Sequence, residues 1–357
     1  MAEDVSRRRK LARFWLRLVC FVLLAALAIG YATYVLTPKH DYGICSMVNL
    51  YRQPENTVDV LAVGTSMVYA GVNPNVLWQE YGIAAYDLCS AEQPFWVSYY
   101  VIREALKTQH PQLILLDAKP SIYVQDYSRR GRTILSTFGI RGLDNRLGAI
   151  LACVEKPADA LDYILGLPQV HDNYATVTWS DFVIPPDNGG RGENWKGFIE
   201  MDAVEHHQRP SMVWTGVKRS MNQREEEYAR RIFELCRDEG IEVMLIGMPN
   251  PDYAGDHMYY NALWAVAEEY GVTGVNFNQP ELRFGLRYST DFADWQHLNV
   301  KGSITLSRAL GAQLREQCGI PDRRDDPAYE SYALAAQSWY ESLPAFESAP
   351  KDKGTSE

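Results

Sequence analysis

Short apolar runs that end at a small or polar residue recur along the chain and predict buried β-strands. They lie at residues 58–63, 84–88, 113–116, 242–246 and 272–277. Because these runs are nearly continuous rather than alternating, they are typical of strands covered on both faces, as in a parallel sheet. The run at 84–88 fits an edge position of that sheet.

Helical patterns separate the predicted strands. One begins with a proline in its first turn at 94–107, and one follows a capping-box sequence at 220–223 and ends at Gly240. Two more cover 258–270 and 299–317. Since parallel strands are joined by right-handed crossovers through helices, this alternation predicts an α/β fold with a doubly wound, mostly parallel, five-stranded sheet.

The N-terminal region follows a different pattern, because residues 18–36 carry no charge and are mostly Leu, Val, Ala and Phe. With the apolar residues 14–16, the stretch approaches the roughly 30 Å of a bilayer core. We therefore expect a basic cytoplasmic segment at 1–13 and an uncleaved transmembrane anchor at 14–36. A signal peptide cleaved near 26–28 and a buried core helix are the alternatives.

The charge distribution supports this topology. The net charge of the 357-residue chain is −10, but residues 1–17 carry six basic and two acidic groups, which leaves −14 for the remainder. A basic head on an acidic body indicates that the head stays in the cytoplasm and the body is exported. The acidic balance also argues against nucleic-acid binding, since phosphate contacts need a basic face.

The rest of the chain divides into a linker, a domain and a tail. We expect the linker at 37–54, the α/β domain at 55–318 and a solvated acidic tail at 319–357, with one more helix possible at 329–343. Residues 119–219 interrupt the strand–helix rhythm with many aromatic residues. We interpret this insertion as a lid or a wall of a ligand site, and ordinary aromatic packing is the alternative.

The six cysteines set few limits on the fold. Cys20 lies in the expected anchor, and the five others have no C-x-x-C spacing. The absence of C-x-x-C spacing excludes a zinc ribbon. An odd number of cysteines outside the anchor does not define a disulfide framework. Glu205, His206 and His207 are adjacent but have no partner at helical spacing, so no metal site is predicted.

A candidate nucleophile directly follows the first predicted strand, in the sequence Gly64-Thr65-Ser66. The carboxyl ends of parallel strands face the ligand crevice, so a serine here can meet a substrate. It becomes a nucleophile only if an imidazole accepts its proton. A residue that merely caps the next helix is the alternative.

A candidate base precedes the last predicted helix, in the segment 294–299 (Asp-Trp-Gln-His-Leu-Asn). Asp294 and His297 are three residues apart and can hydrogen-bond, which fixes the tautomer of the imidazole and stabilises its protonated form. Asn299 is a good helix N-cap. With Ser66 this pair predicts a Ser-His-Asp arrangement, and a surface turn with an incidental histidine is the alternative.

These motifs and their order resemble the SGNH (GDSL-type) hydrolases, in particular the membrane-anchored branch typified by the D-alanyl-transfer protein of teichoic acid synthesis and the alginate O-acetylation proteins. Residues 64–67 lie where that family has its nucleophile block, and 69–74 fit this branch. Residues 294–299 match its D-x-x-H-L-N element, and 86–94 are similar to the stretch that closes its second strand. The resemblance covers about residues 55–318 and implies the flavodoxin-like SGNH fold.

The resemblance implies an exported, membrane-anchored O-acyltransferase or esterase that acts on acyl esters of a cell-envelope polysaccharide or teichoic acid. Ser66 would be the nucleophile, His297 the base, and Asp294 the residue that orients His297. The implied partner is a multi-pass membrane O-acyltransferase. The catalytic domain would lie outside the cytoplasm on a single-pass anchor, and no metal or organic cofactor would be needed.

The chain departs from the family pattern in two blocks. Cys89 and Ser90 replace the glycine of the second block, and residues 117–120 (Asp-Ala-Lys-Pro) replace the G-x-N-D of the third. We expect the oxyanion hole to use the backbone N–H groups of Ser66 and Ser90, with the side chain of Gln93 as a further donor.

Two further residues are expected to contact the substrate. They are Lys119, in the altered third block, and His171, whose His-Asp-Asn-Tyr sequence is similar to an element of the anchored branch. A histidine that is merely buried or that supports other residues is the alternative at 171. The departures also leave a second function open, a catalytically inactive accessory or glycan-binding protein of a cell-envelope acylation system.

Overall fold

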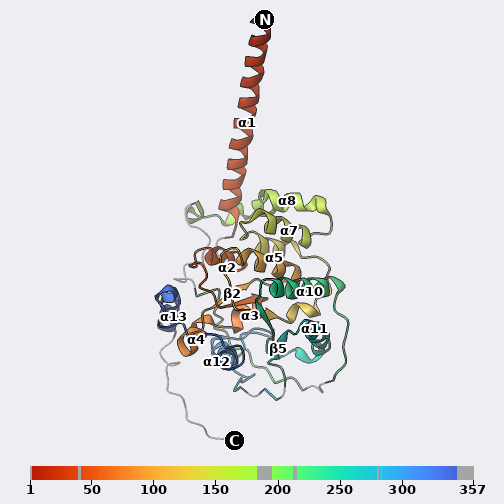
Figure 1. The fold of residues 1–357 in the computed structure, drawn as a ribbon, viewed down its shortest axis with the longest axis vertical. Coiled ribbons are helices and arrows are strands. Elements are labelled where there is room, and N and C mark those ends of the chain that lie inside the picture. Colours follow the sequence, from red (N-terminus) through yellow and green to blue (C-terminus); the bar gives the residue numbers. More distant parts are fainter. Residues whose placement is uncertain are drawn as a thin grey trace.

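A five-stranded, all-parallel sheet lies at the centre of the domain in the computed structural model, which describes residues 2–38, 42–182, 195–211, 215–279, 281–282 and 284–343 (Figure 1). The strand order β2-β1-β3-β4-β5 is that of flavodoxin-like doubly wound sheets, and it reverses at β1 and β3. The predicted strands are confirmed, including the edge position of β2. The strands are β1 (Val60–Gly64), β2 (Ala85–Cys89), β3 (Leu113–Asp117), β4 (Glu242–Gly247) and β5 (Thr273–Asn276).

Helices cover both faces of the sheet. The α-helices are α1 (Ala2–Leu36), α2 (Tyr42–Leu50), α3 (Ser66–Gly71), α4 (Pro74–Tyr81), α5 (Phe95–Ala105), α6 (Arg130–Thr137), α7 (Leu143–Cys153), α8 (Ala160–Leu165), α9 (Leu167–Val170), α10 (Gln223–Asp238), α11 (His257–Glu269), α12 (Val300–Glu316) and α13 (Glu330–Ser342). The 3₁₀ turns are η1 (Lys119–Ile122), η2 (Pro157–Asp159), η3 (His171–Thr176), η4 (Trp179–Phe182), η5 (Tyr253–Gly255) and η6 (Pro327–Tyr329).

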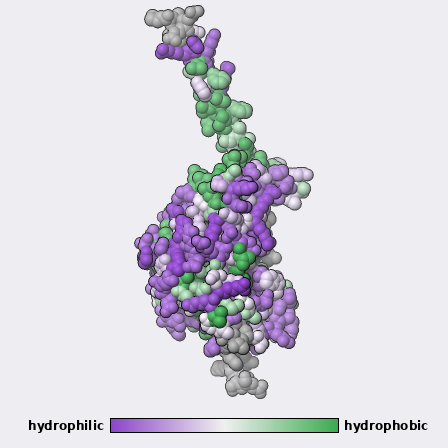
Figure 2. Space-filling view, turned by 90° about the vertical axis from the view of Figure 1, so that its right-hand side faces the viewer, coloured by the Kyte–Doolittle hydropathy of each residue, from purple (hydrophilic) through white to green (hydrophobic). Residues whose placement is uncertain are grey.

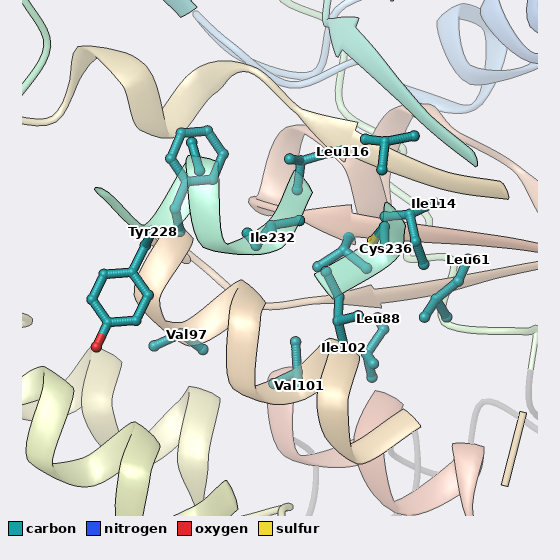
Figure 3. Packing of buried hydrophobic residues seen from close by; sticks show 14 of the residues in the cluster. Leu61, Leu88, Val97, Val101, Ile102, Ile114, Leu116, Tyr228, Ile232 and Cys236 are labelled. Carbon is teal, nitrogen blue, oxygen red and sulfur yellow. The ribbon is translucent and has the colours of Figure 1, made fainter. Parts of the chain in front are cut away.

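The two faces of the sheet form separate buried clusters, because successive side chains of a strand point to opposite faces. Ile114 of β3 packs in one cluster with Ile102 of α5 and Ile232 of α10 (Figure 3). Leu115, the next residue along β3, packs on the other face in the cluster with α3, α4 and α12. The sheet is therefore buried on both sides, as its continuous apolar runs predict.

The predicted helix starts agree with the structure except at α10. Its N-cap is Asn222, whose side-chain oxygen accepts a hydrogen bond from the backbone N–H of Arg224 at 2.8 Å. The expected capping box from Ser220 is wrong, because an N-cap side chain must lie next to the first helical residue and Ser220 lies three residues before Gln223.

The N-terminal helix α1 projects from the domain (Figure 1). Its part from Ser6 to Leu36 is long and apolar enough to cross a membrane, and only 6% of its most apolar window is buried. Figure 2 shows this apolar shaft between a hydrophilic segment of the helix and the body. The helix can serve as a single-pass anchor.

The expected linker at 37–54 is wrong in its greater part. Residues 42–50 form α2, which packs near β2 and buries Ile44, Cys45, Met47 and Leu50. These apolar residues need a covered site in water, so the chain folds back onto the domain soon after α1.

The insertion at 119–219 divides between two places. Its first residues lie at the carboxyl end of β3, whereas α8, α9 and η3 lie at the base of α1 (Figure 1). Arg130 of α6 connects the two regions, because its guanidinium donates to the side chain and backbone carbonyl of Gln169 at 2.7 and 3.0 Å. Residues 183–194 and 212–214 of the insertion lie outside the described residues.

The expected solvated tail is wrong for residues 319–343, while the helix predicted within it is confirmed. In α13, Trp339 is fully buried with its ring centroid 5.8 Å from that of Phe198, and Tyr332 stacks on Trp78. Tyr332, Ala335, Ala336 and Trp339 recur at helical spacing, and this apolar stripe outweighs the polar composition of the segment. Residues 344–357 lie outside the described residues.

We expect Trp339→Ala to lower the free energy of unfolding by about 3–5 kcal/mol, because it leaves a large cavity under α13. Leu334→Ala on the same helix is the matched control, since Leu334 is 53% exposed and its truncation should cost about 0.5 kcal/mol or less. Denaturant unfolding of the full chain in detergent measures both. Equal effects would mean that α13 does not dock.

Candidate active site

Ser66 is the first residue of α3 and follows the end of β1 after Thr65, so it lies at the carboxyl end of the sheet. The helix is capped by Thr65, whose side-chain oxygen accepts a hydrogen bond from the N–H of Met67 at 3.3 Å. The capping role considered for this motif therefore belongs to Thr65, which leaves the hydroxyl of Ser66 for another partner.

That partner is His297, whose Nε2 lies 2.7 Å from the Ser66 Oγ. Both residues are largely buried, with exposed fractions of 8% for Ser66 and 9% for His297. The histidine lies in a turn that is closed by a hydrogen bond from the Ala293 N–H to its carbonyl, and Asn299 caps α12 just beyond. The hydrogen-bonded turn before His297 and the helix cap after it therefore hold the residue in place, so it does not lie on an incidental surface turn.

Asp294 completes the arrangement on the far side of the imidazole, with Oδ2 at 2.8 Å and Oδ1 at 3.0 Å from His297 Nδ1. Its Oδ1 also accepts hydrogen bonds from the backbone N–H groups of Gln296 and His297 at 2.9 Å. Burial alone would raise the pKa of Asp294, but these hydrogen bonds and the His297 ring hold it below its usual value. Asp294 is thus suited to stay ionised and to orient the imidazole.

Asp117 at the end of β3 holds the turn before Ser66 and was not singled out from the sequence. Its Oδ2 accepts hydrogen bonds from the Thr65 N–H at 3.0 Å and the Thr65 hydroxyl at 2.6 Å. Its Oδ1 accepts one from the Lys119 N–H at 2.9 Å. A Cβ at Gly64 would lie 2.2 Å from the Asp117 Cβ, which explains the glycine at that position.

The side chain of Asp117 is fully buried. Burial raises its pKa, and the hydrogen bonds from Thr65 and Lys119 counteract only part of that rise. A carboxyl group is retained there although its burial is unfavourable, which indicates that its hydrogen bonds position the serine turn.

The three expected oxyanion donors differ in what they already bind. The Ser90 N–H donates to the carbonyl of Gly64 at 3.2 Å, and the Gln93 amide donates to the Ser98 hydroxyl at 3.2 Å while its oxygen accepts from the Ser90 hydroxyl. Ser66, as the first residue of α3, has a backbone N–H without an acceptor inside the helix. The arrangement therefore favours Ser66 as a donor and does not support Ser90 or Gln93.

Ser66 opens into a cleft of about 360 Å³ that is lined by aromatic and charged side chains. Lys119 lines it, with its Nζ 2.9 Å from Asp256, whose place in the cleft the sequence did not predict. Arg132 and Glu92 form a second ion pair at 3.1 Å. The cleft thus combines fixed charges with rings, a lining that suits a polar ligand.

His171 lies elsewhere, and its expected place in the substrate groove is not supported. It belongs to η3, near the base of α1, and does not line the cleft that holds Ser66. Its side chain is 60% exposed and contacts Asp172 at 2.9 Å and the carbonyl of Pro168 at 2.9 Å. The residues next to a histidine in the sequence do not show on which part of the domain its segment packs.

The arrangement of Ser66, His297 and Asp294 has the geometry in which an imidazole accepts a serine proton while a carboxylate stabilises the resulting charge. Over the described residues, no three His, Cys, Asp or Glu side chains are placed to hold a metal ion.

We expect Asp117→Ala to destabilise the fold by on the order of 3 kcal/mol, because the Thr65 and Lys119 donors lose their buried acceptor. Asp238→Ala is the control, since that side chain is 70% exposed and should change stability by about 0.5 kcal/mol or less. Denaturant unfolding of the full chain measures both. If Asp117→Ala lowers the free energy of unfolding no more than Asp238→Ala does, Asp117 does not position the serine turn.

We expect the contribution of Asp294 to stability to disappear in acid. Because its folded pKa lies below the usual 3.8, the carboxylate stabilises the fold above that value and the effect is lost as pH falls through the lower folded pKa. The difference in unfolding free energy between wild type and Asp294→Asn should therefore shrink below pH 3.8. Unfolding curves recorded over a pH series measure it, and a difference that grows in acid would contradict the assignment.

Comparison with known proteins does not assign a family, since no protein-family model and no curated protein matches this chain. The likeness to SGNH hydrolases therefore rests on the motifs quoted above.

Proposed function

We propose that this protein is a membrane-anchored serine O-acyltransferase or esterase of the SGNH kind that acts on acyl esters of a cell-envelope polysaccharide or teichoic acid. The observation that carries the proposal is the continuous hydrogen-bonded series from Ser66 through His297 to Asp294, at the mouth of a cleft. Hydrogen-bond distances of 2.7 and 2.8 Å are those at which a proton can pass and an imidazolium can be stabilised.

In the first half-reaction the Ser66 Oγ attacks the carbonyl carbon of the acyl donor while its proton passes to His297 Nε2. The carbonyl π electrons move to oxygen, and the Ser66 N–H is the donor best placed to stabilise that oxyanion. When the tetrahedral intermediate collapses, the bond to the leaving alcohol breaks and His297 returns the proton to the alcohol. An acyl ester on Ser66 remains.

In the second half-reaction a hydroxyl group of the acceptor, or water, gives its proton to His297 and attacks the acyl ester. Collapse of the second tetrahedral intermediate returns the proton to Ser66 and releases the product. Transfer to a sugar hydroxyl and hydrolysis differ only in this acceptor. Exclusion of water from the cleft decides between them.

The helix α1 supports a site of action at a membrane. The basic residues before the apolar stretch favour a cytoplasmic N-terminus, so the cleft would lie on the outer side. An anchor keeps the domain near a multi-pass membrane O-acyltransferase, the donor partner that the resemblance implies, and raises its local concentration. Protease accessibility of the domain in intact cells tests this orientation.

A second candidate function, a non-catalytic accessory or glycan-binding protein, is favoured by the occupied donors near Ser66. The Ser90 N–H and the Gln93 amide both have partners inside the protein, which reduces the support for an oxyanion. Under this alternative the aromatic and charged cleft would bind a glycan without reacting with it.

Reaction of the full chain with a fluorophosphonate probe, followed by intact-mass and peptide analysis, separates the two candidates. We expect one probe per chain, attached to Ser66, and no adduct with Ser66→Ala. With His297→Ala we expect the rate to fall by about a hundredfold or more, because the serine loses its base.

Two controls match the reactive residues. Ser128→Ala removes another serine of the same cleft, and His171→Ala removes a histidine outside it, so both should react like the wild type. Absence of any adduct on the folded wild type would refute the acyltransferase proposal and favour the accessory function. An adduct on Ser128 instead of Ser66 would refute the assigned nucleophile.

A further inference from the structure

A second cavity, of about 320 Å³, lies where the domain meets the base of α1. The last turns of α1 form one wall with Thr33, Tyr34 and Thr37. The other walls come from α2 and from the residues around the end of α6 and the start of α7. Its size lies in the range of small-molecule sites.

Three arginines, Arg52, Arg141 and Arg146, line this cavity, and no acidic side chain does. Over the described part of the chain none of the three has an ion pair. The Nε of Arg146 is buried and has no hydrogen-bond partner. Three guanidinium groups around a cavity that no carboxylate lines make it a positively charged site open to an anion.

Rings rather than carboxylates hold two of the arginines, whereas the third, Arg52, donates a hydrogen bond from Nη1 to the side-chain oxygen of Asn49 at 3.1 Å. Arg141 lies 4.5 Å from the ring centroid of Tyr51, and Arg146 lies 5.3 Å from that of Phe138. Such stacking fixes the plane of a guanidinium and leaves its N–H groups to a ligand. The nearby carboxylate of Glu104 already accepts from Tyr51, Asn145 and the Gly142 N–H, and it pairs with Lys107.

We propose that this arginine-lined cavity binds the phosphate of an anionic lipid head group beside the anchor helix. Arginine forks match the geometry of phosphate oxygens. The position of the cavity favours a lipid as the source of the phosphate. Helix α1 forms one of its walls and, when it spans a membrane, would bring the site to the level of the lipid head groups.

The surface around the base of α1 supports a membrane at this level. The Tyr31 hydroxyl donates to the carbonyl of Phe182 at 3.4 Å. The Thr33 hydroxyl, which donates to the Ile29 carbonyl at 2.9 Å, lies 3.4 Å from the carbonyl of Leu165. These contacts place α8 and η4 against α1 (Figure 1). Large apolar side chains there are exposed to solvent, namely Leu161, Ile164, Leu165, Tyr174, Trp179 and Phe182.

Apolar side chains next to a spanning helix are suited to the boundary between head groups and acyl chains, whereas their exposure to water is unfavourable. The cavity and this apolar surface share α1 as a neighbour. The lipid proposal therefore accounts for both the unpaired arginines and the exposed rings, and it rests on the proposed role of α1 as an anchor.

The test uses the full chain in lipid nanodiscs that contain phosphatidylcholine alone or with phosphatidylglycerol, followed by native mass spectrometry. We expect the protein to retain phosphatidylglycerol. Arg52→Gln and Arg141→Gln should each reduce this retention about fivefold, which corresponds to on the order of 1 kcal/mol per basic residue. Both side chains are exposed, so these substitutions spare the core, and Arg237→Gln on α10 is the matched control with unchanged retention.

Other outcomes would overturn the proposal in distinguishable ways. A chain that enters nanodiscs but retains phosphatidylglycerol no better than phosphatidylcholine would refute the lipid site and leave the anchor intact. A chain that does not enter nanodiscs would refute the anchor itself. Displacement of the lipid by millimolar inorganic phosphate would assign the site to a free phosphate ion instead.

Discussion

The contact between Asp117 and Thr65 is the constraint on which the candidate site depends. It joins the ends of β1 and β3, the two strands between which the order of the sheet reverses, and it holds the turn that begins α3. Ser66 points toward His297 only while that turn keeps its shape. Burial of the Asp117 carboxylate is unfavourable by itself, because the charged group loses its hydration. The fold accepts this penalty at the place where precise geometry is needed.

Much of the fold follows from local patterns in the sequence. The central strands β1, β3 and β4 are short, nearly continuous apolar runs. The starts of α5 and α12 carry a proline and an asparagine that have clear physical roles at helix ends. Ser66, His297 and Asp294 could be selected because each stands beside a predicted element end. Ser66 and His297 are 231 residues apart in the sequence. The parallel topology of the sheet brings them together at its carboxyl end.

The remaining features depend on contacts that local patterns do not encode. Asp117 looks like the polar end of a strand until the neighbouring strand brings Thr65 to it. The segment after residue 319 has a polar composition, yet Trp339 finds a buried place beside Phe198, far away in the sequence. Ser90 and Gln93 have suitable donor groups, but their partners inside the protein could not be known without the fold.

The short connection between α1 and α2 has a consequence for encounter with substrate. Five residues separate Leu36 from Tyr42, and a fully extended chain of that length spans only about 18 Å. With α1 in a membrane, the domain diffuses in two dimensions and its cleft samples a thin layer above the bilayer. Under the proposed function, a polymer would be modified while it passes through that layer, so its growth or export would set how long each hydroxyl group stays within reach.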